Sequence, residues 1–159
     1  MLTTKWNLPP KAKIFEALSA IADSRVKVPA AEKAEVSSST GAKTYIVEWS
    51  PDGKQITSND NASYWQGYLG YPIIATLLFI GRIPYDKQLV QALAGIPWKT
   101  LNKQHRNNYD KAVAAVLQSL QEKGTDTGPI VEMAEKILEQ LPNLDLEKLT
   151  GRRRHPPVE

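Results

Sequence analysis

An apolar segment at residues 72–80 is the strongest constraint on the fold, because it carries hydrophobic side chains on nearly every side. A surface helix has one apolar stripe, whereas a helix that is apolar all round must be buried. We therefore expect a central buried helix here. Its core, residues 73–80, is far too short to cross a bilayer, so no membrane partner is expected. The remaining residues must supply the layers that cover this helix.

Hydrophobic spacing predicts further helices on both sides of this segment. Ile14, Leu18 and Ile21 recur at helical intervals after the start signal of Pro9 and Pro10. The chain reads as helical from residue 61 onward, with glycine and proline marking the helix ends. The expected helices cover residues 9–23, 72–80, 86–94, 97–105, 108–123 and 129–141, with a short one near 145–149.

Alternating β-forming residues predict a small sheet between the first helix and the helical second half. Tyr45, Val47 and Trp49 share one face of a strand at residues 43–49, and a proline-containing turn at 50–53 leads into a partner strand at 54–58. Residues 25–36 suit a single edge strand, because Pro29 interrupts it. The fold class is therefore α+β: an N-terminal helix, an antiparallel meander of about three strands, and about five helices packed on one sheet face.

The length of 159 residues suits one hydrophobic core, since two domains would each approach the size at which folding becomes marginal. We expect a single domain over residues 1–150 and a solvated tail, basic and proline-rich, over 151–159. The N-terminal residues lack the apolar stretch of a secretory signal, which favours a cytoplasmic location.

Metal and cofactor chemistry find little support in the sequence. Cysteine is absent, and the only imidazoles, His105 and His155, match no metal-binding spacing. The usual phosphate-loop, dinucleotide, zinc-protease and hydrolase motifs are also missing. No metal and no cofactor are therefore expected.

Residues 58–71 form the most unusual segment, with a polar turn followed by clustered aromatic residues. If the segment is helical, Tyr64, Tyr68 and Tyr71 make one stripe, which a structural interpretation packs against the sheet. The functional interpretation is a pocket in which aromatic faces and polar groups hold a ligand. The candidate ligand-binding residues are Asn59, Asp60, Asn61, Tyr64, Trp65, Tyr68, Tyr71 and, as an anion clamp, Arg82.

A second candidate surface is basic. Lys99, Lys103, Arg106 and Lys111 form the best cluster of cations, and the first three share a helical face that could contact phosphates. The structural interpretation is a solvated face opposite an acidic row, Glu132, Glu135 and Glu139, on the next helix. Complementary basic and acidic segments also make self-association an expectation.

The aromatic segment has no catalytic constellation beside it, which favours a non-catalytic intracellular module that binds a small molecule or a protein through residues 58–71. One alternative is a small enzyme of unidentified reaction with Asp60 and Arg82 in its site. Another is a weak nucleic-acid binder that uses the cluster at residues 99–111.

Overall fold

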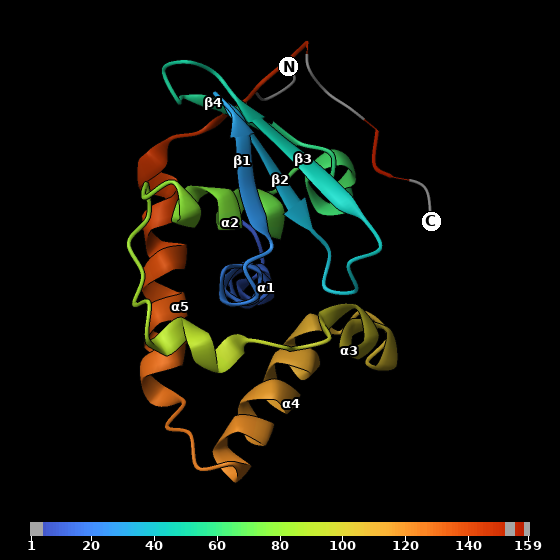
Figure 1. Cartoon of the computed structure of the whole chain (residues 1–159), viewed down its shortest axis with the longest axis vertical. Coiled ribbons are helices and arrows are strands. Elements are labelled where there is room, and N and C mark those ends of the chain that lie inside the picture. The colour runs from blue at the N-terminus through green and yellow to red at the C-terminus, as the bar shows by residue number, and fades with distance from the viewer. Residues whose placement is uncertain (1–4, 152–154, 158–159) are drawn as a thin grey trace.

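The computed structural model describes residues 5–151 and 155–157, which form a five-stranded sheet and a set of helices (Figure 1). The elements in chain order are α1 (Lys11–Ala22), β1 (Val26–Ala30), β2 (Lys33–Ser37), β3 (Thr44–Trp49), β4 (Gln55–Ser58), η1 (Ala62–Gln66), α2 (Tyr71–Phe79), η2 (Leu89–Leu93), α3 (Trp98–Gln104), α4 (Tyr109–Glu122), α5 (Gly128–Gln140), η3 (Leu141–Leu144) and β5 (Glu147–Lys148). The α+β class expected from the sequence is confirmed. Of the expected tail, residues 152–154 and 158–159 lie outside the described residues.

The sheet has the order β1-β2-β3-β4-β5, with β1 to β4 antiparallel and β5 parallel to β4. The sheet therefore has five strands, whereas about three were expected. Residues 25–36 form two strands of a hairpin, because the chain reverses at Glu32 in a left-handed conformation (φ 63°). That turn carries no glycine or asparagine, so its sequence gives no hairpin signal.

The short helix expected near residues 145–149 was a wrong prediction, because residues 147–148 form the fifth strand, β5. Glu147 N–H donates to the Lys54 carbonyl at 2.9 Å, and Leu149 N–H donates to the Ile56 carbonyl at 3.1 Å. Lys5 forms an antiparallel bridge to Glu147, so the chain at this residue covers the outer side of β5. At the opposite edge of the sheet, β1 contains Pro29 and an irregular register.

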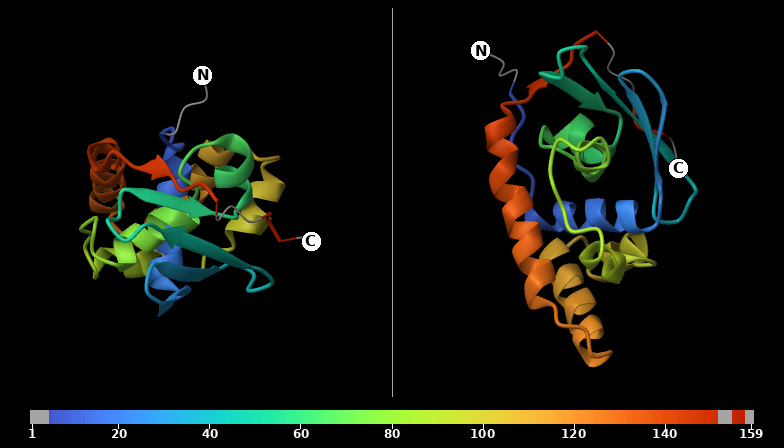
Figure 2. Two further views of the ribbon diagram at one scale, coloured as in Figure 1. Left: turned by 90° about the horizontal axis from the view of Figure 1, so that it is seen from above. Right: turned by 60° about the vertical axis from the view of Figure 1, so that its left-hand side comes forward.

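The expected central helix is confirmed as α2, in which Ile73, Ile74 and Leu77 are fully buried. It packs between α1 and the inner face of the sheet, contacting β1 to β4. Figure 2 shows α1 running across the base of the sheet, with α5 crossing its N-terminal end at a large angle. Since α1 also contacts α4 and η2, it is surrounded, and even its Lys13 and Glu16 are buried.

Helix α3 lies below the loop that joins β2 to β3, as Figure 1 shows. The Trp98 indole N–H donates to Ser19 Oγ at 2.8 Å, and Ser19 Oγ donates to the Leu93 carbonyl at 2.7 Å, which anchors α3 on α1 and η2. Lys99 N–H donates to Ser39 Oγ at 3.3 Å, linking α3 to the loop above it. The cleft between these elements is the candidate site. No helix within the described ranges has the length and apolar character needed to cross a bilayer.

Candidate functional site

A cleft opens between α1, the β2–β3 loop and the α3–α4 region, and it consists of two adjoining chambers. The chambers share Lys13, Tyr45, Asn61, Tyr71 and Tyr109, so a single ligand could extend through both. The basic chamber, of about 350 Å³, is lined by Lys13, Glu16, Arg25, Ser38, Ser39, Lys43, Tyr45, Asn61, Tyr71, Trp98, Lys99, Asn102, Lys103, Arg106, Asn107 and Tyr109. The aromatic chamber, of about 450 Å³, is lined by Lys13, Tyr45, Asp60, Asn61, Ala62, Trp65, Gln66, Tyr68, Tyr71 and Tyr109.

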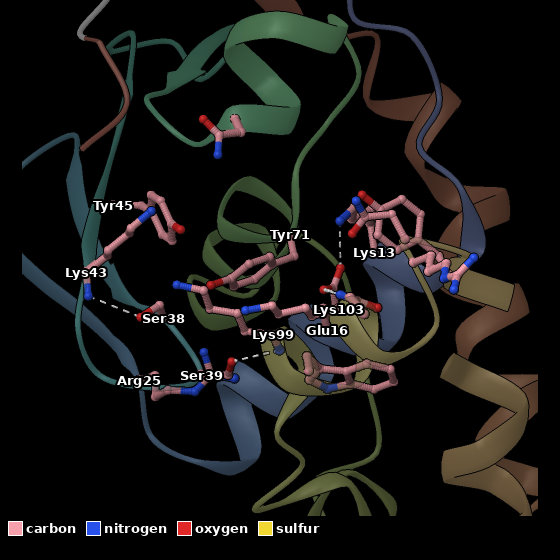
Figure 3. A pocket seen from close by; sticks show the side chains of 16 residues that line it. Lys13, Glu16, Arg25, Ser38, Ser39, Lys43, Tyr45, Tyr71, Lys99 and Lys103 are labelled. Carbon is pink, nitrogen blue, oxygen red and sulfur yellow. Dashed lines mark hydrogen bonds and ion pairs between the residues drawn. The ribbon is translucent and has the colours of Figure 1, made fainter. Parts of the chain in front are cut away.

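The basic chamber brings together six cationic side chains and one carboxylate from segments far apart in the sequence. Figure 3 shows Arg25 and Lys43 on one side, Lys13 and Glu16 on the other, and Tyr71 between them. Lys99, Lys103 and Arg106 are exposed, whereas Lys13 is buried. Within the described part of the chain, Lys103 and Arg106 pair with no carboxylate. The chamber therefore presents an excess of positive charge toward its opening.

The one carboxylate of the basic chamber, Glu16, is already engaged. Lys13 Nζ lies 2.9 Å from Glu16 Oε2, and the Asn102 side-chain amide donates to Glu16 Oε1 at 2.9 Å. Lys13 Nζ also lies 4.3 Å from the centre of the Tyr109 ring, within cation–π range. Burial acts to lower the pKa of Lys13, but the attraction and hydrogen bond to Glu16 outweigh it and raise that pKa. The Asn102 hydrogen bond links α3 to α1, and Glu16 is already occupied by its two partners.

Tyr71 lines both chambers. Its ring packs edge-on against Tyr45 with 6.1 Å between ring centroids, as the structural interpretation of the aromatic segment expected. Burial strongly raises the pKa of Tyr71, with a further increase from Tyr45, while Arg25 acts to lower it. Arg25 is held in place because its Nη1 donates to the Ser37 carbonyl at 2.7 Å and its Nε lies 3.4 Å from Asp23 Oδ2.

The turn between α3 and α4 holds two residues in the left-handed region, Arg106 (φ 53°) and Asn107 (φ 62°). Neither is glycine, so the turn stores backbone strain, and Arg106 carries more of it because asparagine tolerates this conformation better. Both residues line the basic chamber. Strained non-glycine residues often occur at binding sites.

In the aromatic chamber, Asp60 is only 4% exposed. Its Oδ2 accepts the Ser63 N–H at 3.0 Å, whereas its buried Oδ1 has no hydrogen-bond partner. Gly70 packs directly on this carboxylate, and a β-carbon at residue 70 would overlap it. The Gly70 N–H donates to Ser63 Oγ at 3.0 Å, so Asp60, Ser63 and Gly70 are all in mutual contact.

The expected single stripe of Tyr64, Tyr68 and Tyr71 is not formed. η1 is a π-helical turn that ends at Gly67 in a left-handed conformation (φ 73°), and α2 begins only at Tyr71. The chain between them is not helical, because the glycine redirects it. Tyr68 and Tyr71 nevertheless both line the aromatic chamber, whereas Tyr64 turns toward His155, with 3.0 Å between Tyr64 Oη and His155 Nδ1.

Most of the other candidate residues lie in the cleft. Asp60, Asn61 and Trp65 line the aromatic chamber, and Lys99, Lys103 and Arg106 line the basic chamber. Besides Tyr64, three further candidates line neither chamber. Asn59 bonds to the sheet, its Oδ1 accepting the Ile46 N–H at 2.8 Å; Arg82 Nη1 donates to the Gly53 carbonyl at 2.8 Å; and Lys111 is exposed on α4.

The acidic row of α5 does not face the basic cluster. Glu135 pairs with Lys11 at 3.2 Å, and Glu132 pairs with Lys136 at 3.3 Å on its own helix. The cluster faces α1 and the β2–β3 loop instead, because α3 lies beneath that loop.

Sequence reasoning missed the contributions of α1 and the sheet to the cleft, namely Lys13, Glu16, Arg25, Lys43 and Tyr45. One signal was available. Lys13 and Glu16 stand one turn apart on a helix whose other inner positions are apolar, a spacing that permits an ion pair. The remaining residues come together only through the tertiary fold.

Among residues 5–151 and 155–157, no group of His, Asp and Glu side chains is placed to hold a metal ion. Searches of curated proteins and of solved structures found no match to this chain. One family model does match, over residues 6–147, a range that includes both chambers of the cleft. The chain therefore belongs to the family described as uncharacterised conserved protein UCP014422.

Proposed function

We propose that this protein is a non-catalytic binding module for a small anionic ligand, whose charged group occupies the basic chamber. One observation carries the proposal: six cationic side chains converge on a cavity of about 350 Å³ whose single carboxylate is paired with Lys13. A cavity of this volume falls in the range used for small-molecule ligands. Phosphate or carboxylate groups are the natural partners of such a set of donors.

The electrostatic cost of the arrangement supports a binding role. Like charges held close together repel one another and destabilise the folded state. A purely structural surface at α3 would avoid this cost with neutral polar residues. Lys103 and Arg106 are exposed and have no carboxylate partner within the described residues, so they contribute little to stability and are available to an anion.

Inorganic pyrophosphate is a suitable probe, because it supplies the charge without any further group. It should raise the melting temperature of the protein, since a ligand that binds only the folded state stabilises it. The affinity measured by isothermal titration calorimetry should fall as the salt concentration rises. Lys103→Gln should weaken binding about tenfold, the usual effect of losing one hydrogen bond to a charged group.

Lys111→Gln is the matched control, because Lys111 belongs to the same basic stretch but lines neither chamber. It should leave pyrophosphate binding unchanged. The proposal fails if pyrophosphate does not bind the wild-type protein, or if Lys111→Gln weakens binding as much as Lys103→Gln does.

Catalysis, nucleic-acid binding and self-association remain predictions that are separate from this proposal. A catalytic role for Asp60 with Arg82 lacks support from position, because Arg82 donates to Gly53 and lines neither chamber. Weak nucleic-acid binding would share Lys99, Lys103 and Arg106 with the proposed small ligand, so a competition experiment must separate the two. Self-association is tested by light scattering across a range of protein concentrations.

A further inference from the structure

The aromatic chamber has the composition of a site for a flat ring. Tyr45, Trp65, Tyr68, Tyr71 and Tyr109 all line it. Trp65 is 67% exposed although its ring packs against Tyr64 in a T-shaped contact with 4.5 Å between ring centroids, and such exposure is unusual for so large an apolar side chain. Aromatic planes of this kind stack on nucleic-acid bases regardless of sequence.

Asp60 adds a specific polar requirement to this chamber. Its Oδ1 is a buried acceptor without a partner, which is costly in a folded protein and commonly marks a functional group. Gly70 and the Ser63 N–H hold the carboxylate in one orientation, so the vacant acceptor is fixed in place. A ligand N–H would satisfy it. Asp60 lines the aromatic chamber, so a ring held there lies beside this carboxylate.

The two chambers meet at Lys13, Asn61, Tyr45, Tyr71 and Tyr109. A molecule lying across this junction would place a ring among the aromatic side chains and a charged group among the cations. We propose, building on the proposed function, that the ligand is a nucleotide whose base carries an N–H donor to Asp60 Oδ1 and whose phosphates occupy the basic chamber.

The first experiment compares inorganic pyrophosphate with the 5′-diphosphates of adenosine, guanosine, cytidine and uridine by calorimetry. At least one nucleotide should bind about tenfold more tightly than pyrophosphate, because stacking on an aromatic side chain adds affinity for the base. Its binding should also quench tryptophan fluorescence, and Trp65→Phe identifies the part of the signal that comes from Trp65.

Asp60→Asn tests the polar contact. The Ser63 N–H needs an oxygen as its acceptor, so the new amide must turn its NH₂ group to the position of Oδ1. This change converts the vacant acceptor into a donor. The variant should lose about tenfold in affinity for the preferred nucleotide, the usual effect of losing a hydrogen bond to a charged group, and keep its affinity for pyrophosphate.

Asp126→Asn is the matched control, because Asp126 is exposed, accepts a backbone N–H from Gly128 at 3.1 Å, and lines neither chamber. Trp65→Ala provides a second test if Asp60→Asn does not fold, since Trp65 is exposed and its removal leaves the core intact. It should weaken nucleotide binding and leave pyrophosphate binding unchanged.

Each adverse outcome has a distinct meaning. If no nucleotide binds more tightly than pyrophosphate, or if both test variants bind the preferred nucleotide like wild type, the nucleotide assignment is overturned and the anion site stands. If pyrophosphate does not bind, the proposed function itself fails. If a short single-stranded oligonucleotide displaces the nucleotides and binds far more tightly, the cleft belongs to a nucleic-acid surface instead.

Discussion

Asp60 keeps its position because residue 70 has no side chain. Gly70 has an ordinary backbone conformation (φ −74°), so what demands glycine here is space, not torsion. A β-carbon at this position would meet the Asp60 carboxylate and would lie 2.7 Å from Ser63 Oγ. The vacant acceptor of the aromatic chamber thus depends on a residue that does not itself touch the ligand.

Gly70→Ala should lower the free energy of unfolding by about 2 kcal/mol, because the added methyl group forces a packed carboxylate to move. Urea unfolding measures the change. Gly128→Ala is the control, since a β-carbon there meets only Asp126 Oδ1 at 3.3 Å and the backbone is also ordinary. We expect the control to stay within about 0.5 kcal/mol of wild type. Equal effects of the two substitutions would contradict this account.

Among the elements, the turn between α3 and α4 combines strain with charge. Arg106 adopts a left-handed conformation and extends a cation into the lining of the basic chamber. Both properties oppose stability, since the backbone is strained and the guanidinium lies among other cations. An arrangement that lowers the stability of the folded protein in this way is expected at a binding site.

Arg106→Gly should therefore stabilise the empty protein by about 0.5 to 1 kcal/mol, net of the greater entropy that glycine gives the unfolded chain. The same variant should bind pyrophosphate less tightly than wild type. Arg106→Gln removes the charge and keeps the backbone strain. Comparing the free energies of unfolding of the two variants in urea therefore separates the effect of strain from the effect of charge. An Arg106→Gly protein no more stable than Arg106→Gln would show that the turn is not strained.

Long periodic segments made several elements predictable from sequence. α1, α4 and α5 follow helical spacing closely, α2 is apolar on nearly every side, and β3 and β4 are joined by a turn with proline and glycine in favourable positions. The β1–β2 hairpin was missed because Glu32 makes its turn without a typical turn residue. β5 was missed because its two residues acquire a strand conformation only by pairing with β4, a contact between distant segments.

The candidate site was predictable only in pieces. The sequence indicated an aromatic segment and a basic cluster as separate, competing sites. Their convergence depends on the β2–β3 loop lying above α3, which the Lys99 to Ser39 hydrogen bond helps to fix and no local pattern encodes. Tyr68 lines the aromatic chamber and Tyr64 contacts His155, because Gly67 redirects the chain between the two tyrosines.

For the molecule as a whole, the cleft influences how stability depends on pH. The pKa of Tyr71 is raised by burial, that of Tyr68 is raised by burial in opposition to Lys13, and that of Lys13 is raised because Glu16 outweighs burial. In each case the folded state holds a proton that the unfolded state releases at lower pH. Stability from these groups is therefore complete below about pH 10 and is lost as the pH rises above it.

The free energy of unfolding in urea should fall above about pH 10, the ordinary pKa of tyrosine. Tyr71→Phe should reduce the slope of that fall by about 1.4 kcal/mol per pH unit, since one fewer proton is released on unfolding. The measurement compares wild type and variant from pH 8 upward at constant ionic strength. A variant with the same slope as wild type would show that Tyr71 ionises readily in the folded protein.

The two edges of the sheet determine whether copies of the protein can associate by strand pairing. Pro29 has no N–H to offer and Lys27 is an exposed charge on β1, while β5 and Lys5 cover the far side of β4. Neither border gives a neighbouring polypeptide a continuous ladder to extend. Within the described residues, the sheet thus offers crowded molecules no backbone seam along which to stack into fibres, and an assembly formed at this sheet must be built from side-chain surfaces.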